Sequence, residues 1–336
     1  MIGRDQLVGL TRQLVDVPSV TGEEKAVADF LFARLSSEGW ICSRQAVSDG
    51  RFNVLATRGT PRVIFSTHLD TVPPFIASSE DQEFVYGRGA CDAKGIAAAM
   101  TCAAEQLSAE GRTDVALLFV VGEETVSDGA EAAVGSTPPA AFLINGEPTD
   151  NELVTGHKGM VLVRIEAEGR AAHSGYPETG VSAIARLIDV LQDLRAQSFP
   201  EDPALGRPYL NIGIIQGGVA ANVIPDRAHA ALALRTVTDS EFYVDRLRAL
   251  VGDRCRLVVV KSSEPQSMLA LPRFKSKVVG YGTDIPILRA LGRPLMLGPG
   301  SIVDAHTPGE KVSKRELFEA VDLYVELVRE LDNWCD

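Results

Sequence analysis

The chain is poor in cysteine and in histidine. It has five of each in 336 residues, and no two cysteines have the Cys-x-x-Cys spacing. An odd number of cysteines without that spacing argues against a disulfide framework and against a zinc site made of thiolates. We therefore expect reduced thiols that take no part in a metal site.

Positive charge and long apolar runs are also scarce. The chain carries 33 lysine and arginine residues against 45 aspartate and glutamate residues, a formal net charge of −12. This balance argues against nucleic acid as a partner. No apolar segment approaches the roughly 20 residues of a membrane span, so we expect no membrane partner. The 45% hydrophobic and 23% charged content is ordinary for a globular protein, and the length allows two domains.

The beginning of the chain predicts two helices. Charged residues interrupt the first apolar stretch at Arg4, Asp5, Arg12 and Asp16. Their presence favours an amphipathic helix over a signal peptide, and a cytoplasmic location follows by default. Residues 21–24, Thr-Gly-Glu-Glu, fit a capping box ahead of a second helix that ends near Ser37.

One of the five histidines lies where a predicted strand ends. The apolar run 63–65 leads into Ser-Thr-His-Leu-Asp at 66–70. Side chains two apart on a strand share a face, so His68 and Asp70 can act as two metal ligands, or as a ligand and the carboxylate that orients it. Alone, the triplet is more typical of an ordinary loop after a buried strand than of a metal site.

Three further apolar runs end in the same way. Residues 114–121 stop at Gly-Glu-Glu, 140–144 stop at Asn-Gly-Glu-Pro, and 293–297 lead into Gly-Pro-Gly-Ser, with His306 shortly after. In open α/β sheets ligands bind outside the carboxyl ends of the strands, so these side chains are predicted to converge there. A glycine-rich turn at 86–95 opens a helix over 96–107, and its Asp92 is either a helix N-cap, a metal ligand or both.

The candidate ligands combine imidazole and carboxylate groups: His68, Asp92, Glu123, Glu124, Glu147 and His306. This mixture suits zinc, and also cobalt or manganese. One ion cannot use so many ligands, whereas two ions about 3.5–4 Å apart, bridged by one carboxylate and a water, take two further protein ligands each. One glutamate is then left over to accept the proton of an attacking water and return it to the leaving amine.

Six motifs resemble those of a known family, the dinuclear zinc hydrolases that include acetylornithine deacetylase, succinyl-diaminopimelate desuccinylase, aminoacylase and carboxypeptidase G. The motifs are STHLDTVP at 66–73, GRGACDAKG at 87–95, GEE at 122–124, GEPT at 146–149, AHSGYP at 172–177 and LGPGSIVDAH at 297–306. They occur in the family's order and span nearly the whole chain. Within the family, GEPT, the following His-Lys-Gly at 157–159 and GPGSIxxAH look most like acetylornithine deacetylase.

The resemblance implies a role for each ligand. Asp92 becomes the bridging carboxylate, with His68 and Glu147 on one ion and Glu124 and His306 on the other, and the ions are expected to be zinc. Glu123 becomes the general base, and Asp70 holds the His68 ring through its other nitrogen. The peptide bond after the bridging aspartate is often cis in this family, which here is Asp92–Ala93.

The middle of the chain predicts a separate module. Residues 160–168 alternate as a strand and 180–194 have helical spacing; strands follow at 211–216 and 229–235, a helix at 241–250 and a strand at 256–261. The order β-α-β-β-α-β is that of a ferredoxin-like, two-layer α+β module. We therefore predict an α/β protein whose discontinuous zinc-exopeptidase-type catalytic domain, residues 1–153 and 266–336, carries an inserted domain at 154–265.

In this family such an insert serves as a lid and dimer interface. The resemblance implies a homodimer in which His173 reaches the partner's active site and stabilises the oxyanion; the alternative is a surface histidine bonded to Ser174. Asn222 and Arg235 match positions that hold the substrate's α-carboxylate, and a guanidinium fork fits that group. Position 233 is alanine where the family often has aspartate, so Arg235 has the alternative of a solvated charge on an edge strand.

The predicted activity is hydrolysis of the amide bond of an N-acyl-L-amino acid such as N-acetylornithine, by metal-activated water, as in arginine biosynthesis. Glutamate at position 147 favours a deacylase, because family members that cleave acyl groups from amino acids have this ligand. The alternatives are a succinyl-diaminopimelate desuccinylase, a deacylase of acetylcitrulline or acyl-lysine, a dipeptidase or carboxypeptidase, and a non-catalytic binding protein on the same fold.

Overall fold

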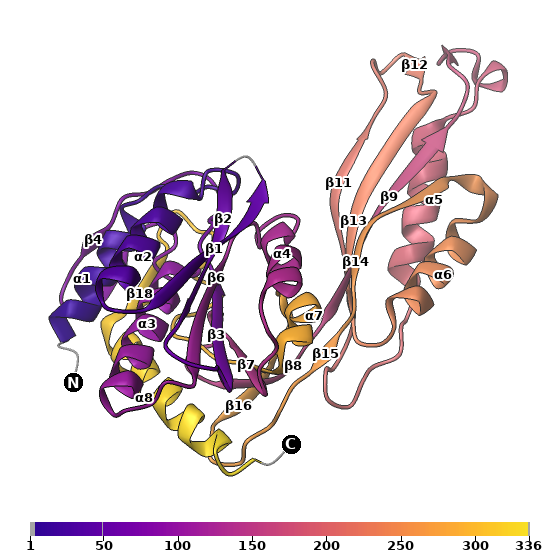
Figure 1. The fold of residues 1–336 in the computed structure, drawn as a ribbon. Helices are drawn as coiled ribbons and strands as arrows, with labels where there is room; N and C mark the ends of the chain where they lie inside the picture. The colour runs from indigo at the N-terminus through magenta and orange to yellow at the C-terminus, as the bar shows by residue number, and fades with distance from the viewer. Residues whose placement is uncertain (1–3, 49, 335–336) are drawn as a thin grey trace. The chain divides into compact units, whose positions relative to one another are not determined.

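The chain forms two compact units. The computed structural model describes residues 4–48 and 50–334. The first unit comprises the described residues up to Thr155, Met268–Lys277 and those from Thr283 onward, and the second comprises Gly156–Ser267 and Val278–Gly282. The second unit is therefore an insertion into the first (Figure 1).

A large sheet forms the centre of the first unit. Among the described residues it has nine strands, in the order β1-β2-β6-β3-β7-β17-β8-β15, with β16 also paired to β8. The strands are β1 (Ile41–Ser48), β2 (Arg51–Thr57), β3 (Val63–His68), β6 (Val115–Val120), β7 (Phe142–Asn145), β8 (Leu153–His157), β15 (Gln266–Ser267), β16 (Ser276–Val279) and β17 (Arg293–Met296). Strands β6, β3, β7 and β17 run parallel to one another, so their carboxyl ends lie at one edge of the sheet.

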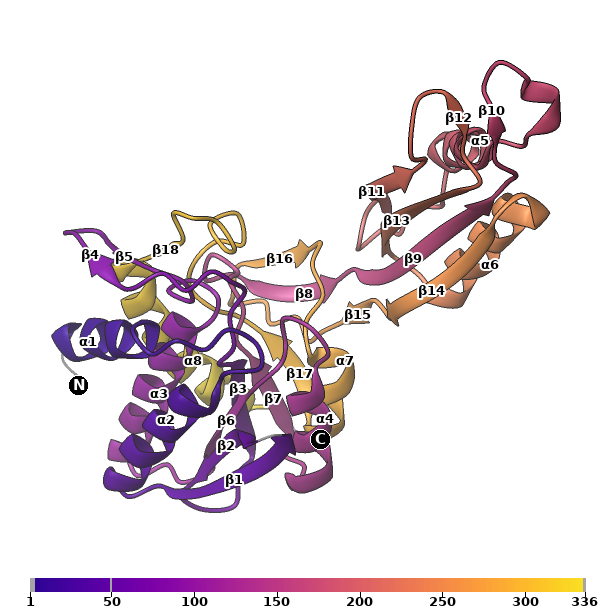
Figure 2. The same ribbon diagram turned by 90° about the horizontal axis from the view of Figure 1, so that it is seen from above.

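Helices cover both faces of this sheet (Figure 2). The helices are α1 (Arg4–Val15), α2 (Lys25–Ser37), α3 (Lys94–Ala109), α4 (Asp128–Ser136), α7 (Ile285–Leu288) and α8 (Lys314–Leu331). Alternate residues of β3 separate the two layers, because Val63 and Phe65 pack in the core with α1, α2, α3 and α8 whereas Ile64 packs in the core with α4 and α7. A small sheet of β4 (Ser79–Glu80), β5 (Phe84–Tyr86) and β18 (Lys311–Ser313) lies beside them.

The second unit has the predicted β-α-β-β-α-β order. Its elements are β9 (Gly159–Glu168), α5 (Ala183–Ala196), β11 (Tyr209–Gly217), β13 (Arg227–Thr236), α6 (Ser240–Val251) and β14 (Arg256–Ser263). The strands form an antiparallel sheet in the order β11-β13-β9-β14, and alternate side chains of β9 and β13 pack against the two helices. A separate pair, β10 (Ala172–His173) and β12 (Val223–Ile224), lies at one end of this sheet (Figure 2). The predicted fold class is confirmed.

Two expectations from the sequence have different outcomes. The predicted capping box before α2 is wrong: the Thr21 hydroxyl donates to Asp70 Oδ2 at 2.8 Å, and Glu24 pairs with Arg51. The four described cysteines, Cys42, Cys91, Cys102 and Cys255, are free thiols as expected, and position 335 lies outside the described residues. None of the described helices combines the length and apolar character needed to cross a membrane.

Two glycines on α4 give a matched test of this packing. A Cβ added at Gly129 would lie 2.1 Å from the Val121 carbonyl oxygen and 2.7 Å from Asn53 Oδ1, whereas one at Gly135 would meet nothing within 4 Å. We expect Gly129→Ala to lower the free energy of unfolding by about 1–3 kcal/mol through overpacking. Gly135→Ala should raise it by up to about 1 kcal/mol, because alanine favours the helix. Urea unfolding of both variants measures the difference, and equal effects would contradict the close packing of α4 on the sheet.

Candidate metal centre

Asp92 lies at the centre of the predicted site. Its Oδ1 is 2.9 Å from His68 Nε2, and its Oδ2 is 3.3 Å from His306 Nε2. One carboxylate that contacts an imidazole at each oxygen has the arrangement of a ligand shared by two ions. The residue that precedes α3 is Ala93, so Asp92 is not the helix N-cap. The Asp92–Ala93 peptide bond is cis, as the resemblance implies.

Glu124 completes a cluster on the His306 side. Its Oε1 is 2.9 Å from His306 Nε2, and ligand atoms of His68, Asp92 and Glu124 all lie within 4.8 Å of one another. Imidazole nitrogens and carboxylate oxygens at these distances suit zinc, cobalt or manganese. The donor set therefore fits a divalent metal.

Glu147 and Glu123 bring further negative charge to the same edge of the sheet. Glu147 follows β7, is buried, and accepts a hydrogen bond from Asn145 Nδ2 at 3.2 Å. Burial, with the nearby charges of Asp92 and Glu124, raises its pKa well above the usual value, although His68 acts in the opposite direction. Burial and the charge of Glu147 likewise raise the pKa of Glu123. The candidate ligands thus come from five separate segments, and each interacts electrostatically with at least one of the others.

Asp70 has a wider role than the predicted one. His68 Nδ1 lies 3.0 Å from the Asp70 carbonyl oxygen and 3.5 Å from its Oδ1. A carbonyl only accepts, so Nδ1 carries the hydrogen, and in the neutral ring the Nε2 lone pair is free for a metal. The Asp70 carboxylate also accepts hydrogen bonds from the backbone N–H groups of Glu123 and Glu124, each at 3.1 Å. Asp70 therefore orients both the histidine and the turn that carries the two glutamates.

A partly buried ion-pair network holds the other side of that turn. Arg51 donates to both oxygens of Glu24, at 2.7 and 2.8 Å, and to Asp128 Oδ2 at 2.6 Å. The turn begins at Gly122, where φ is +80° and an added Cβ would lie 2.1 Å from Asp128 Oδ1. No local pattern in the sequence marks this network, because Arg51 lies far from the turn along the chain.

The second unit holds three predicted site residues at two different places. His173 pairs with Val223 across β10 and β12, and the Ser174 N–H donates to the Asn222 carbonyl at 3.0 Å, so His173 and Asn222 lie together. His173 is exposed, and its Nδ1 accepts from the Gly175 N–H at 3.1 Å.

Arg235 lies at the opposite end of β13 from this pair. Arg227 begins the strand near β12, and Arg235 lies eight positions after it. At the usual rise of a strand these eight positions span about 27 Å. β13 is a central strand between β11 and β9, so the edge-strand alternative for Arg235 is wrong. Within one chain these residues do not form a single site.

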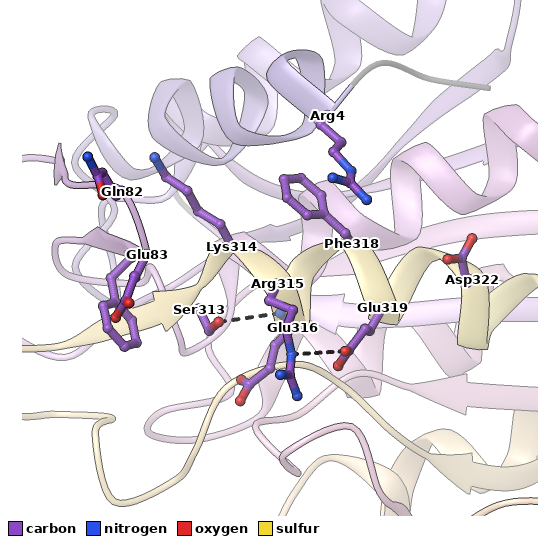
Figure 3. A pocket seen from close by; sticks show the side chains of 11 residues that line it. Arg4, Gln82, Glu83, Ser313, Lys314, Arg315, Glu316, Phe318, Glu319 and Asp322 are labelled. Atoms are coloured by element: carbon purple, nitrogen blue, oxygen red, sulfur yellow. Dashed lines mark hydrogen bonds and ion pairs between the residues drawn. The ribbon is translucent and has the colours of Figure 1, made fainter.

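A surface pocket of the first unit is unrelated to the predicted centre. Its lining comes from α1, β5 and the first turns of α8, and Arg4 lies over the Phe318 ring at 5.2 Å (Figure 3). Arg315 Nε pairs with Glu319 at 3.0 Å in the same pocket. The lining includes no predicted site residue. An exposed ion pair such as Arg315–Glu319 is typical of an ordinary protein surface.

Comparisons with known proteins agree with this geometry. The sequence matches the peptidase family M20/M25/M40 over residues 64–330. It is 37% identical over 337 residues to a peptidase M20 domain-containing protein of Schizosaccharomyces pombe, covering 96% of this chain and 84% of that protein. It is 35% identical over 384 residues to a probable carboxypeptidase of Aspergillus fumigatus, covering 98% and 87%. The chain therefore belongs to the peptidase family M20/M25/M40.

The fold has a similar counterpart among solved structures. A tripeptidase from Staphylococcus aureus superposes with a TM-score of 0.86 at 20% sequence identity, covering 99% of this chain and 100% of that chain. The names of these relatives, carboxypeptidase and tripeptidase, do not support the narrower resemblance to acetylornithine deacetylase. The broader prediction, a metal-dependent hydrolase family, is confirmed.

The charges at the centre predict how metal affinity depends on pH. Hydrogen bonds with Asp92 and Glu124 raise the pKa of His306 to about 10, so the ring of the metal-stripped protein holds a proton at neutral pH. A cation displaces that proton, and the apparent zinc affinity should rise between pH 6 and pH 9, by roughly tenfold per pH unit for each proton displaced. Calorimetric titration in buffers of different ionisation enthalpy measures the protons released.

The matched variants are His306→Ala, which should release one proton fewer, and His229→Gln, which should behave as wild type because His229 lies on β13. A zinc affinity that is independent of pH over this range would contradict the hydrogen-bonded arrangement of His306.

Proposed function

We propose that the protein is a dinuclear metal-dependent exopeptidase that hydrolyses a peptide bond of short peptides with a free α-carboxylate. The observation that carries the proposal is the Asp92 carboxylate between His68 and His306, beside Glu123. Membership in a peptidase family and the 35% identity to a probable carboxypeptidase favour a peptide substrate.

In this proposal His68 and Glu147 would hold one ion, Glu124 and His306 would hold the other, and Asp92 would be a ligand of both. When bound, the two ions polarise the scissile carbonyl and lower the pKa of a water molecule. Glu123 accepts the proton of that water and delivers it to the leaving amine.

The proposed substrate contacts need two chains. His173 and Asn222 lie at one end of the sheet of the second unit and Arg235 at the other, so one small substrate does not contact all three within a chain. In a homodimer formed through the second unit, His173 of one chain stabilises the oxyanion in the site of the other, and Arg235 binds the α-carboxylate. Strand β11 is an edge strand with Ile214 and Ile215 exposed, which makes it a candidate dimer contact.

A second candidate is an N-acyl-L-amino-acid deacylase. Glu147 favours it, because glutamate at this ligand position is shared with family members that remove acyl groups. Such an enzyme has the same centre and differs in the acyl half of the substrate, so activity with N-acetylornithine or N-succinyl-diaminopimelate in preference to peptides would decide for it.

The substrate class can be tested directly. Metal-stripped protein reloaded with zinc or cobalt should release amino acids from di- and tripeptides, and C-terminal amidation of the same peptides should abolish release because the α-carboxylate is lost. Preference for N-acetylornithine would favour the deacylase. Binding of peptides with no turnover of any compound would favour a non-catalytic protein.

The role of Glu123 has its own test. Glu123→Gln should lower kcat by about 10²–10⁴-fold, because general acid–base catalysis contributes that much. Zinc stoichiometry should stay as in wild type, since the proposed base is not a ligand. Glu131→Gln, an exposed position on α4, is the matched control and should keep full activity. A fully active Glu123→Gln variant would show that another group transfers the proton.

Mixing two inactive variants tests the dimer. Glu123→Gln and His173→Ala should each have little activity. If His173 acts in the partner's site, refolding the two together in equal amounts restores about a quarter of the wild-type activity, since half of the dimers are mixed and each has one intact site. Absence of recovery in a mixture that contains dimers would place His173 outside catalysis or in its own chain's site.

A further inference from the structure

Glu310 is a buried acid that the reaction proposed above does not use. It lies four positions after His306 and directly before β18, and only 1% of its surface is exposed. Its Oε1 accepts hydrogen bonds from three backbone N–H groups of the glycine-rich turn: Gly89 at 2.9 Å, Cys91 at 3.2 Å and Asp92 at 3.1 Å. The carboxylate is therefore bonded to the backbone of Asp92 itself.

The other oxygen of Glu310 is paired with a buried cation. Glu310 Oε2 accepts from Arg88 Nη1, and Arg88 is 2% exposed. The same guanidinium donates to the Pro74 carbonyl at 3.3 Å and to the Thr307 carbonyl at 3.4 Å. Burial of two charges is costly unless both are paired and hydrogen-bonded, and here both conditions are met.

These contacts connect the glycine-rich turn that ends in Asp92 with the segment that carries His306. The Gly87 N–H donates to the Glu310 carbonyl oxygen at 3.0 Å, so both the backbone and the side chain of Glu310 hold the turn that ends in Asp92. Arg88 holds the turn to Thr307, next to His306. Because Asp92 and His306 belong to these two segments, the Glu310–Arg88 pair fixes the spacing between a shared ligand and a ligand of one ion.

We propose that Glu310 is a positioning residue of the metal centre, which sets the affinity for the ion held by Asp92, Glu124 and His306. The proposal rests on the metal centre described above and not on the identity of the substrate. Removing the carboxylate charge would leave Arg88 without its buried partner and weaken the acceptor for three N–H groups, so the turn would no longer hold Asp92 in place.

The test is calorimetric zinc titration of metal-stripped Glu310→Gln, with thermal unfolding of the metal-free protein measured alongside. The variant keeps the shape of the side chain, and we expect zinc affinity to fall by about 10–100-fold, the range seen when a residue that supports a metal ligand is changed. The melting temperature of the metal-free variant should fall, because the buried Arg88 loses its charged partner, but the protein should remain folded at the temperature of the titration. Glu105→Gln is the control. Glu105 lies near the C-terminal end of α3, whereas Asp92 lies just before its N-terminal end, so this variant should bind zinc as wild type does.

Two outcomes would overturn the proposal. Wild-type zinc affinity in a folded Glu310→Gln protein would show that the residue only supports the fold. If Glu310→Gln does not fold, Arg88→Lys replaces it, because lysine keeps the positive charge and loses the fork of donors. Weaker zinc binding with an unchanged metal-free melting temperature supports the proposal in that variant, and wild-type affinity overturns it.

Discussion

The parallel alignment of β3, β6, β7 and β17 is the constraint on which the site depends. Parallel neighbours place their carboxyl ends at one edge of a sheet, so the segments that follow them must meet there. His68, the glutamates of the Gly122 turn, Glu147 and the segment that leads to His306 follow four such strands. Their apolar residues form the cores on both faces of the sheet. The packing that stabilises the first unit therefore also assembles its ligands.

Charge is the second determinant of the site. Burial raises the pKa of Glu123 and Glu147, and hydrogen bonds with carboxylates raise the pKa of His306. The shifts of Glu147 and His306 oppose the ionisation states in which these two residues bind a metal. Contacts from Asp70, Arg51 and Glu310 hold the backbone segments that carry Glu123, Glu124 and Asp92. The centre is thus maintained by residues that need not touch a metal.

The sequence predicted those helices, strands and strand ends that a local sequence pattern marks. Apolar runs that stop at a histidine or a glutamate marked the strand ends, and alternating and helical periods marked the β-α-β-β-α-β order of the second unit. It did not predict the contacts of Thr21, Arg51 and Glu310. A polar residue whose partner lies far along the chain produces no periodic pattern in the sequence from which the contact could be predicted. The alternative of an edge-strand charge at Arg235 failed for a related reason, since strand order within a sheet is set by pairing that the sequence does not display.

The insertion of the second unit has a consequence for how the protein is made. Glu147 precedes the insertion and His306 follows it, so the entire second unit is synthesised between these two residues. During translation the growing chain gains His306, its last histidine ligand, only after most of the first unit and all of the second unit have been synthesised. A protein of this design acquires its complete ligand set late, and a chain that stops early cannot assemble the full centre.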